Sequence, residues 1–210
     1  MSSYDGFAPD FFDRVDGSDD AEFYRPERLV THIDDGAIAA VGSLYTELGI
    51  TGDVLDVMSS WISHFERPPS TLTVLGMNET ELQSNPMADE RVIHDLNRNQ
   101  ELPFADASFD DAVCCVSVDY LIRPLEVFAE VRRVLRPGGR FVCTFSNRYF
   151  PTKAIQGWMM LDDRQRMNLV ALYFDRTAGF ERPIGQVRRP AGLGDPLMAV
   201  WAATAAASDS

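Results

Sequence analysis

One stretch of the chain combines an acid, two hydroxyl groups and a turn in a spacing that suits ligand binding. It runs Asp53-Val-Leu-Asp-Val-Met-Ser-Ser-Trp61. Its apolar residues predict a buried strand over 54–57, and Asp56 lies near the carboxyl end of that strand. The turn that follows holds Met58, Ser59 and Ser60. This is the outline of a nucleotide-cofactor site, except that the turn has none of the glycines that usually form it.

The elements around this stretch alternate between strands and helices. Apolar spacing predicts helices over residues 37–48, 60–65, 79–83, 124–135 and 163–174. Short apolar runs predict strands over residues 54–57, 71–75, 91–94, 111–116, 140–145, 184–188 and 197–202. This alternation predicts an α/β fold with a mostly parallel seven-stranded sheet, helices on both faces and a C-terminal antiparallel hairpin.

The length of 210 residues suits one α/β domain with an N-terminal extension. We expect the extension and its covering helices over 1–49, the main domain over 50–205 and a disordered tail over 206–210. Residues 1–20 are acidic and lack the basic start and apolar core of a signal peptide. No apolar run approaches the roughly 20 residues that span a bilayer. A cytoplasmic monomer or homodimer with no membrane association is therefore expected.

The formal net charge is −13 at pH 7. A surface that binds a nucleic-acid backbone needs a basic stripe, and the basic residues here cluster no further than pairs such as Arg132-Arg133. We therefore expect no nucleic-acid partner. An acidic surface with Lys153 as the only lysine suits high salt, so a salt-adapted source is a hypothesis. The cysteines lie in apolar runs, which predicts buried thiols rather than disulfides or a metal site: Cys114, Cys115 and Cys143.

Four segments follow one another in an order that is characteristic of one family. They are Val-Leu-Asp-Val at the first strand, Val-Leu-Gly-Met-Asn at the second, Leu-Pro-Phe-Ala-Asp-Ala-Ser-Phe-Asp-Asp-Ala-Val before the fourth, and Val-Leu-Arg-Pro-Gly-Gly-Arg-Phe before the fifth. In this order they resemble the S-adenosylmethionine-dependent class I methyltransferases, over about residues 50–205. The resemblance implies a Rossmann-like fold, S-adenosylmethionine as cofactor and methyl transfer as the reaction.

The resemblance also implies roles for residues at the strand ends. The family places an acid after the second strand to bind the ribose hydroxyls, and Asn78 stands there; its amide keeps hydrogen bonds but loses the charge that strengthens them. Asp95 falls near the family's acid for the adenine amino group, and Leu96 is expected to form a wall for the ring. The cofactor-binding residues implied in this way are Asp56, Met58, Ser59, Ser60, Asn78, Asp95, Leu96 and Ser117.

The turn after the first strand departs from the family pattern D-x-G-x-G. Glycine permits positive φ and a close approach to the ligand, whereas serine in such a conformation costs about 1 kcal/mol more. In one interpretation, Ser59 and Ser60 beside a helix N-terminus bind the carboxylate of the cofactor. In the other, the pocket has decayed and Ser59 only caps the helix.

Three side chains are candidate proton acceptors: His64, His32 and Tyr120. Each also has a structural interpretation. His64 can pack on the sheet together with Trp61, Tyr120 can be a half-buried anchor, and His32 can be a surface residue.

Substrate binding has candidates in two segments. Tyr24 and His32 precede the core, where family members place covering helices. The loop beyond the fifth strand brings together Asn147, Arg148 and Lys153, which suit an anionic substrate group. The alternative for these cations is ion pairing with nearby acids such as Asp162.

These observations predict S-adenosylmethionine-dependent methyl transfer to a small-molecule acceptor. Proximity alone supplies about 7 to 11 kcal/mol in such reactions, so neither a metal nor a catalytic triad is required. The alternative is a catalytically inactive protein with the methyltransferase fold, acting as a binding or interaction module. Nicotinamide-dependent oxidoreduction fits less well, because no G-x-G-x-x-G motif follows a strand.

Overall fold

The structure is a computed structural model that describes residues 4–192 and 194–206. Its helices are α1 (Asp20–Phe23), α2 (Asp35–Glu47), α3 (Glu79–Gln83), η1 (Val118–Tyr120), α4 (Pro124–Val134), α5 (Gln156–Met159) and α6 (Asp163–Arg176). Its strands are β1 (Asp53–Val57), β2 (Thr71–Gly76), β3 (Glu90–Ile93), β4 (Phe109–Cys115), β5 (Leu135–Phe145), β6 (Ile184–Arg189) and β7 (Leu197–Ala203). The predicted tail overlaps residues 207–210, which lie outside the described part.

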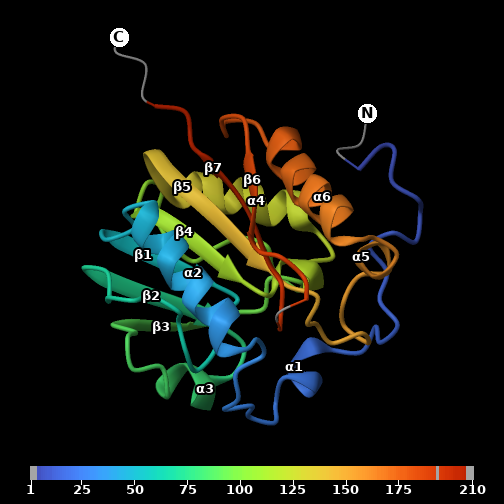
Figure 1. Cartoon of the computed structure of the whole chain (residues 1–210), viewed down its shortest axis with the longest axis horizontal. Coiled ribbons are helices and arrows are strands. Elements are labelled where there is room, and N and C mark those ends of the chain that lie inside the picture. The colour runs from blue at the N-terminus through green and yellow to red at the C-terminus, as the bar shows by residue number, and fades with distance from the viewer. Residues whose placement is uncertain (1–3, 193, 207–210) are drawn as a thin grey trace.

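The strands form one seven-stranded sheet in the order β3-β2-β1-β4-β5-β7-β6 (Figure 1). Strands β1 to β5 are parallel, and β7 is antiparallel to both β5 and β6. The predicted mixed sheet with its C-terminal hairpin is confirmed. The order reverses between β1 and β4, so the crevice that such a sheet offers to ligands lies at the carboxyl ends of these two strands.

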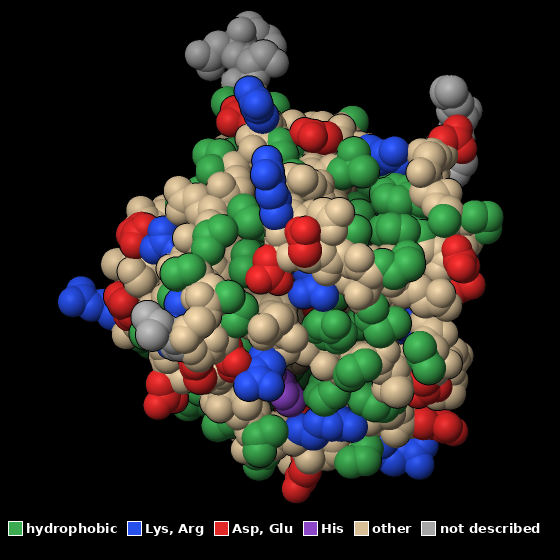
Figure 2. All heavy atoms as spheres, turned by 45° about the vertical axis from the view of Figure 1, so that its right-hand side comes forward, with side chains coloured by type: hydrophobic (Ala, Val, Ile, Leu, Met, Phe, Trp, Pro, Cys, Tyr) green, Lys and Arg blue, Asp and Glu red, His purple; other side chains and the backbone are tan. Residues whose placement is uncertain are grey.

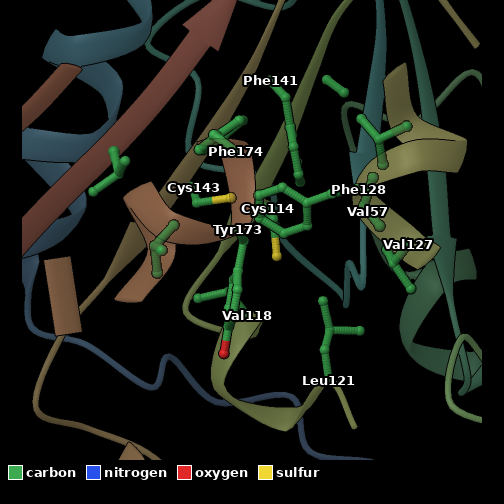
Figure 3. Packing of buried hydrophobic residues seen from close by; sticks show 14 of the residues in the cluster. Val57, Cys114, Val118, Leu121, Val127, Phe128, Phe141, Cys143, Tyr173 and Phe174 are labelled. Atoms are coloured by element: carbon green, nitrogen blue, oxygen red, sulfur yellow. The ribbon is translucent and has the colours of Figure 1, made fainter. Parts of the chain in front are cut away.

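Two apolar cores cover the two faces of the sheet. One face packs against α2, whose residues Val41 and Leu44 lie among side chains of β1 and β2. The other packs against α4 and α6, where Figure 3 shows Cys114 and Cys143 among the rings of Phe128, Phe141 and Phe174. Both thiols are buried and free, as predicted, whereas Cys115, predicted to be buried as well, is free but only half-buried.

Local signals in the sequence explain most helix boundaries. Asp34 caps α2 by accepting a hydrogen bond from the amide of Ala37. Pro124 stands in the first turn of α4, where its missing N–H costs nothing. Asp162 and Gln165 form a capping box at the start of α6.

The helix predicted over 60–65 is wrong. Residues 58–70, all of them described, form only turns and bends between β1 and β2. Met58 has a positive φ and the amide of Ser59 donates to Leu75 O, so the backbone leaves the helical path at this turn, and Pro68-Pro69 closes the segment. The suggestion that a helix N-terminus attracts the cofactor's carboxylate at this turn therefore has no structural basis.

The N-terminal segment is hydrogen-bonded to the start of α5. The backbone oxygens of Phe11 and Asp13 accept hydrogen bonds from Gly157 and Gln156, both at 2.8 Å. Figure 1 shows this segment running past α5 and α6 before it reaches α1 and α2. Among the described residues, no helix combines the length and apolarity needed to cross a bilayer.

A buried ion cluster holds the N-terminal segment in place. The side chain of Lys153 is 0% exposed, and its ammonium lies 3.0 Å from Asp20 Oδ1 and 3.1 Å from Asp16 Oδ2. Asp20 is also paired with Arg14 at 2.7 Å. Burial alone would raise the pKa of Asp20, but hydrogen bonds from Arg14, Asn97 and Lys153 outweigh it and lower that pKa.

Replacing Lys153 with methionine should destabilise the protein strongly. The substitution keeps most of the volume but removes one of the two cations that pair with the buried Asp20, a type of change that costs about 3 kcal/mol or more. Urea unfolding measures the loss. Glu47→Gln, which weakens an exposed pair with Arg188, is the matched control and should cost less than about 1 kcal/mol. Equal effects of the two substitutions would contradict this role for Lys153.

Candidate functional site

A cavity of about 280 Å³ opens at the carboxyl ends of the parallel strands. Its sheet side is formed by four groups of residues that each follow a strand: Met58, Ser59 and Ser60 after β1; Gly76, Met77 and Asn78 at the end of β2; His94, Asp95, Leu96 and Asn97 after β3; Val116 and Ser117 after β4. These are the positions at which an open α/β sheet binds its ligands. Figure 2 shows a histidine at the floor of a surface hollow, with basic side chains beside it.

The turn after β1 contains no glycine, although the family pattern has glycine there. Met58 adopts a left-handed conformation with a φ of 58°. The amide of Ser59 donates to Leu75 O at 2.8 Å, which draws the turn against the end of β2. The contact is so close that a Cβ on Gly76 would lie 2.3 Å from Ser59 O. The glycine needed for the close approach is thus on the neighbouring strand.

Asp56 shapes this turn and does not line the main cavity. Its Oδ2 accepts hydrogen bonds from the hydroxyls of Ser59 at 2.8 Å and Ser63 at 2.6 Å. Burial raises the pKa of Asp56 to about 6, and the two serine hydroxyls oppose the rise. The Ser59 hydroxyl, which was predicted to bind the cofactor, therefore holds the loop instead.

Asn78 and Glu81 fasten the N-terminal segment over the cavity. The Asn78 amide donates to the backbone oxygens of Tyr24 and Arg25, and its oxygen accepts from the amide of Glu81. Glu81 accepts hydrogen bonds from the backbone N–H of Arg28 at 2.7 Å and from the hydroxyl of Ser60 at 2.6 Å. The side chain expected to bind ribose hydroxyls is thus engaged in attaching residues 20–32, which we call the roof.

The end of β3 supplies an acid and an apolar wall. Asp95 Oδ1 accepts from the amide of Asn97 at 2.9 Å, which fixes the carboxylate at the cavity. Leu96 is 3% exposed and lines the cavity beside it. Asn97 donates to Asp20 and to Tyr120 O, both at 2.9 Å, and so joins this side to the roof.

The opposite wall is aromatic and basic. Its members come from the roof, from η1 and from the loop after β5: Tyr24, Arg28, His32, Tyr120, Arg148, Tyr149 and Phe150. Arg28 lies over the ring of Phe150 at 5.5 Å, and the His32 ring meets Phe150 edge-on at 5.3 Å. Arg148 is held by Asp195 through Nε at 2.6 Å, while its side chain stays 62% exposed.

Tyr120 does not suit the role of a base. Its hydroxyl accepts a hydrogen bond from the amide of Phe150 at 2.9 Å. Burial and the nearby carboxyl of Asp119 raise the pKa of Tyr120 well above its usual range, so the proton stays on the oxygen. Among the three residues predicted to take a proton, only His32 lines the main cavity with ring nitrogens that make no hydrogen bond to the residues that the structure describes.

Four predicted site residues lie away from the main cavity. Asp56 and His64 line a smaller adjoining cavity, Asn147 is exposed on the surface, and the Lys153 ammonium is buried in the ion cluster described above. The remaining predicted residues all line the main cavity: Met58, Ser59, Ser60, Asn78, Asp95, Leu96, Ser117, Tyr24, His32, Tyr120 and Arg148.

Sequence reasoning missed several residues of the cavity. Asp20, Arg28 and Glu81 belong to the roof and its attachment, and they reach the site through contacts between segments far apart in the chain. His94 directly precedes Asp95, and this position beside an expected cofactor residue was a usable signal. Tyr149 and Phe150 adjoin Arg148 and were visible in the same way.

Comparisons with known proteins agree with this architecture. Residues 59–143 match the family model described as "Methyltransferase domain". Over 140 residues the chain is 25% identical to the biotin biosynthesis bifunctional protein BioHC of Teredinibacter turnerae, covering 63% of this chain and 25% of that protein. Over 43 residues it is 42% identical to sterol 4-C-methyltransferase strm-1 of Caenorhabditis elegans, covering 20% of this chain and 13% of that protein. The chain thus spans a quarter or less of the length of these curated relatives.

Among solved structures, a similar one is the 1,6-didemethyltoxoflavin-N1-methyltransferase of Burkholderia thailandensis, with bound 1,6-didemethyltoxoflavin and S-adenosylhomocysteine. The TM-score is 0.58 at 16% identity, with 82% of this chain and 80% of that chain covered. This likeness concerns the fold, which is the Rossmann-like fold of class I methyltransferases. The family match over residues 59–143 and this fold are both similar to the class I methyltransferases. S-adenosylmethionine is the cofactor that these similarities indicate for the site.

The residues present fit that cofactor. An adenosine moiety needs hydrogen-bonding groups beside an apolar wall, and Asp95 with Leu96 provides both at the end of β3. Met58, Met77 and Val116 give the sheet side of the cavity an apolar surface suited to the sulfonium carbon chain. A poor match is Asn78, whose amide is committed to the roof.

The buried Asp56 should make stability depend on pH. A folded-state pKa of about 6, above the unfolded value of 3.8, means that the folded protein binds the proton more tightly. Its stabilising contribution is full below pH 3.8 and is lost as pH rises through 6, by about 3 kcal/mol. Asp56→Asn lacks this proton equilibrium. The free energy of unfolding of the variant minus that of the original protein should therefore rise by about 2 to 3 kcal/mol between pH 4 and pH 7.

Urea unfolding of both proteins at several pH values between 4 and 7 measures this difference, because the other titrating groups cancel. Asp106→Asn, at a side chain 79% exposed, is the control and should show no such trend. A flat difference for Asp56→Asn would show that burial does not perturb this carboxyl group.

Proposed function

We propose that the protein transfers the methyl group of S-adenosylmethionine to a small-molecule acceptor. The observation that carries the proposal is a single cavity with two chemically different walls: strand-end residues on the sheet side, and an aromatic, basic wall opposite. The first wall suits a nucleoside cofactor and the second an acceptor. The family match over residues 59–143 supports the reaction class, and the chain's own residues support the division of the cavity.

When bound, the cofactor supplies an electrophilic methyl group on a positively charged sulfur. The chain's own residues orient the two partners and exclude water. Asp95 and Leu96 hold the adenosine end, and the roof covers the cavity through its bonds to Asn78 and Glu81. Such positioning supplies about 7 to 11 kcal/mol of the barrier lowering. Where the acceptor carries a proton, His32 is the residue placed to receive it.

The acceptor wall favours an anionic molecule with a planar part. Arg28 and Arg148 place two positive charges at the cavity of a chain whose net charge is −13. Asp20, which also lines the cavity, is already paired with Arg14 and Lys153. Tyr149 and Phe150 offer ring surfaces beside Arg148. The acidic remainder of the surface supports our proposal that the acceptor is not a nucleic acid.

A second candidate function is a catalytically inactive binding module. Met58 stands in a left-handed conformation where the family has glycine, and the Asn78 amide is committed to the roof. Both departures reduce the groups available for the cofactor. Calorimetric titration with S-adenosylmethionine and S-adenosylhomocysteine separates the candidates: micromolar binding supports the enzyme, and no heat at millimolar ligand supports the module.

Asp95→Asn should weaken S-adenosylhomocysteine binding by about 1 to 2 kcal/mol, because the amide keeps the hydrogen-bonding oxygen but loses the charge. Calorimetry measures the dissociation constant. Asp106→Asn, an exposed acid outside the cavity, is the matched control and should bind as the original protein does. Equal affinity of all three proteins would remove Asp95 from the cofactor site.

Arg148→Gln should weaken binding of the acceptor and leave binding of the cofactor unchanged. Methyl-labelled S-adenosylmethionine incubated with a small-molecule extract identifies the acceptor by mass spectrometry. With that acceptor, the variant should raise KM about fivefold, the effect of an exposed charge contact of about 1 kcal/mol. The dissociation constant for S-adenosylhomocysteine should not change. Arg188→Gln, on the edge strand, is the control, and an unchanged KM in Arg148→Gln would contradict an anionic acceptor.

A further inference from the structure

The two arginines of the acceptor wall differ in the donors that they leave for a ligand. The terminal nitrogens of Arg28 donate to the backbone oxygens of Pro26 at 3.1 Å and Phe23 at 2.8 Å, so this side chain holds the roof together. Arg148 is bonded through Nε, to Asp195 Oδ1 at 2.6 Å. Its two terminal nitrogens make no hydrogen bond to any residue that the structure describes. Of the two, Arg148 therefore has donors available for an acceptor.

The bond at Nε decides which edge of the Arg148 guanidinium a ligand meets. A guanidinium held at Nε leaves the edge that carries both terminal nitrogens, and this edge forms two parallel hydrogen bonds to a planar anion such as a carboxylate. Arg148 lines the main cavity next to Tyr149 and Phe150, and its side chain is 62% exposed. An unanchored side chain at such an exposed position loses rotamer freedom when it binds a ligand, which weakens binding by about two- to tenfold.

Asp195 is itself fixed by contacts outside the cavity. Its Oδ2 accepts from the backbone N–H of Asp34 at 3.0 Å, and its own N–H donates to Asp34 Oδ2 at 2.8 Å. Arg189 donates to Asp195 O at 2.7 Å. The backbone approaches so closely that a Cβ on Gly194, whose φ is 104°, would clash with the Asp34 carboxylate. The anchor of Arg148 is therefore rigid and buried.

The same contacts join Asp195 to the roof. Asp34 lies just after the roof in the chain and caps α2. Within the roof, Val30 O accepts a hydrogen bond at 3.0 Å from the indole N–H of Trp61, which follows the turn after β1. The loop between β6 and β7 is thus held against a segment that is itself attached to the sheet, and Arg148 takes its orientation from both.

Resting on the proposed function, we infer that Asp195 is a positioning residue for the acceptor. Its carboxylate holds Arg148 so that the two terminal nitrogens are presented to the cavity, where they bind a planar anionic group of the acceptor such as a carboxylate. Asp195 also offsets part of the charge of Arg148. The arrangement therefore suits a single negative charge, and a phosphate monoester, with about −1.5 to −2 charges at pH 7, fits less well.

The probes for this contact are 4-fluorobenzoate and 4-fluorobenzamide, which have nearly the same shape and differ in charge. Fluorine NMR titrations give both dissociation constants, and their ratio is the preference for the anion. The original protein should prefer 4-fluorobenzoate by about fivefold, the effect of one charge contact. Arg148→Lys keeps the positive charge but lacks the edge with two nitrogens, so it should lose most of this preference. An unchanged preference in Arg148→Lys, or tighter binding of 4-fluorophenyl phosphate than of 4-fluorobenzoate by the original protein, overturns the two-bond contact.

Two substitutions of Asp195 test the positioning role. Asp195→Ala removes the anchor and should weaken 4-fluorobenzoate by about two- to tenfold, whereas Asp195→Asn, which keeps an oxygen for Arg148 Nε, should restore most of the loss. If Asp195 only offset charge, both substitutions would strengthen the binding of this anion, and that result overturns the inference. In an Arg148→Gln background, Asp195→Ala should have no further effect on 4-fluorobenzoate. An equal loss in that background would show that Asp195 does not act through Arg148.

Asp34→Ala is the matched control, because it disturbs the same contacts but keeps the bond from its backbone N–H to Asp195. It should lower stability in urea and leave the affinity for 4-fluorobenzoate within about twofold; a loss as large as that of Asp195→Ala would indicate general loosening and overturn the inference. Calorimetry with S-adenosylhomocysteine tests the proposed function separately. If this ligand binds and 4-fluorobenzoate is not preferred, the positioning role fails and the proposed function stands. If S-adenosylhomocysteine does not bind, the proposed function fails, and the titrations of the Asp195 variants still decide the positioning role.

Discussion

The site depends on the ion pairs and the hydrogen bond of one buried carboxylate, that of Asp20. It is 4% exposed and joins three segments of the chain, since it pairs with Arg14 and Lys153 and accepts a hydrogen bond from Asn97. Each partner comes from a different part of the sequence, and their meeting fixes the roof against the loops that follow β3 and β5. A carboxylate at this depth is stable only because its charge is balanced twice. The cavity is therefore a product of tertiary contacts as much as of the sheet.

The sheet itself could be predicted from the sequence, because buried parallel strands appear as apolar runs and the helices between them carry clear caps. The predicted helix over 60–65 failed for a specific reason. Its apolar spacing is compatible with a helix, but the amide of Ser59 donates to Leu75 O on the neighbouring strand, and this contact depends on a fold that local patterns do not encode. The N-terminal roof was expected as a covering element, although its attachment points were not.

The position of a site residue could be predicted where the residue directly follows a strand. It could not be predicted where contacts between distant segments of the chain decide it. Met58, Asp95, Leu96 and Ser117 follow strands directly and line the cavity as expected. Lys153 has the charge for substrate binding, but the acids that bury it precede it by more than a hundred residues in the chain. Asn78 stands at the expected position and yet serves the roof, because a neutral amide can cap α3 and bind two backbone oxygens at once.

The bond between Trp61 and the roof has a practical consequence for optical work. The other two tryptophans, Trp158 and Trp201, are 1% and 7% exposed and lie in the apolar cores. Trp61 is the more exposed of the three, and its indole bridges the seam between the turn and Val30. Changes in ultraviolet emission when the seam opens or tightens will therefore arise mainly from one indole. The native protein carries its own fluorescent reporter of roof movement, without any attached dye.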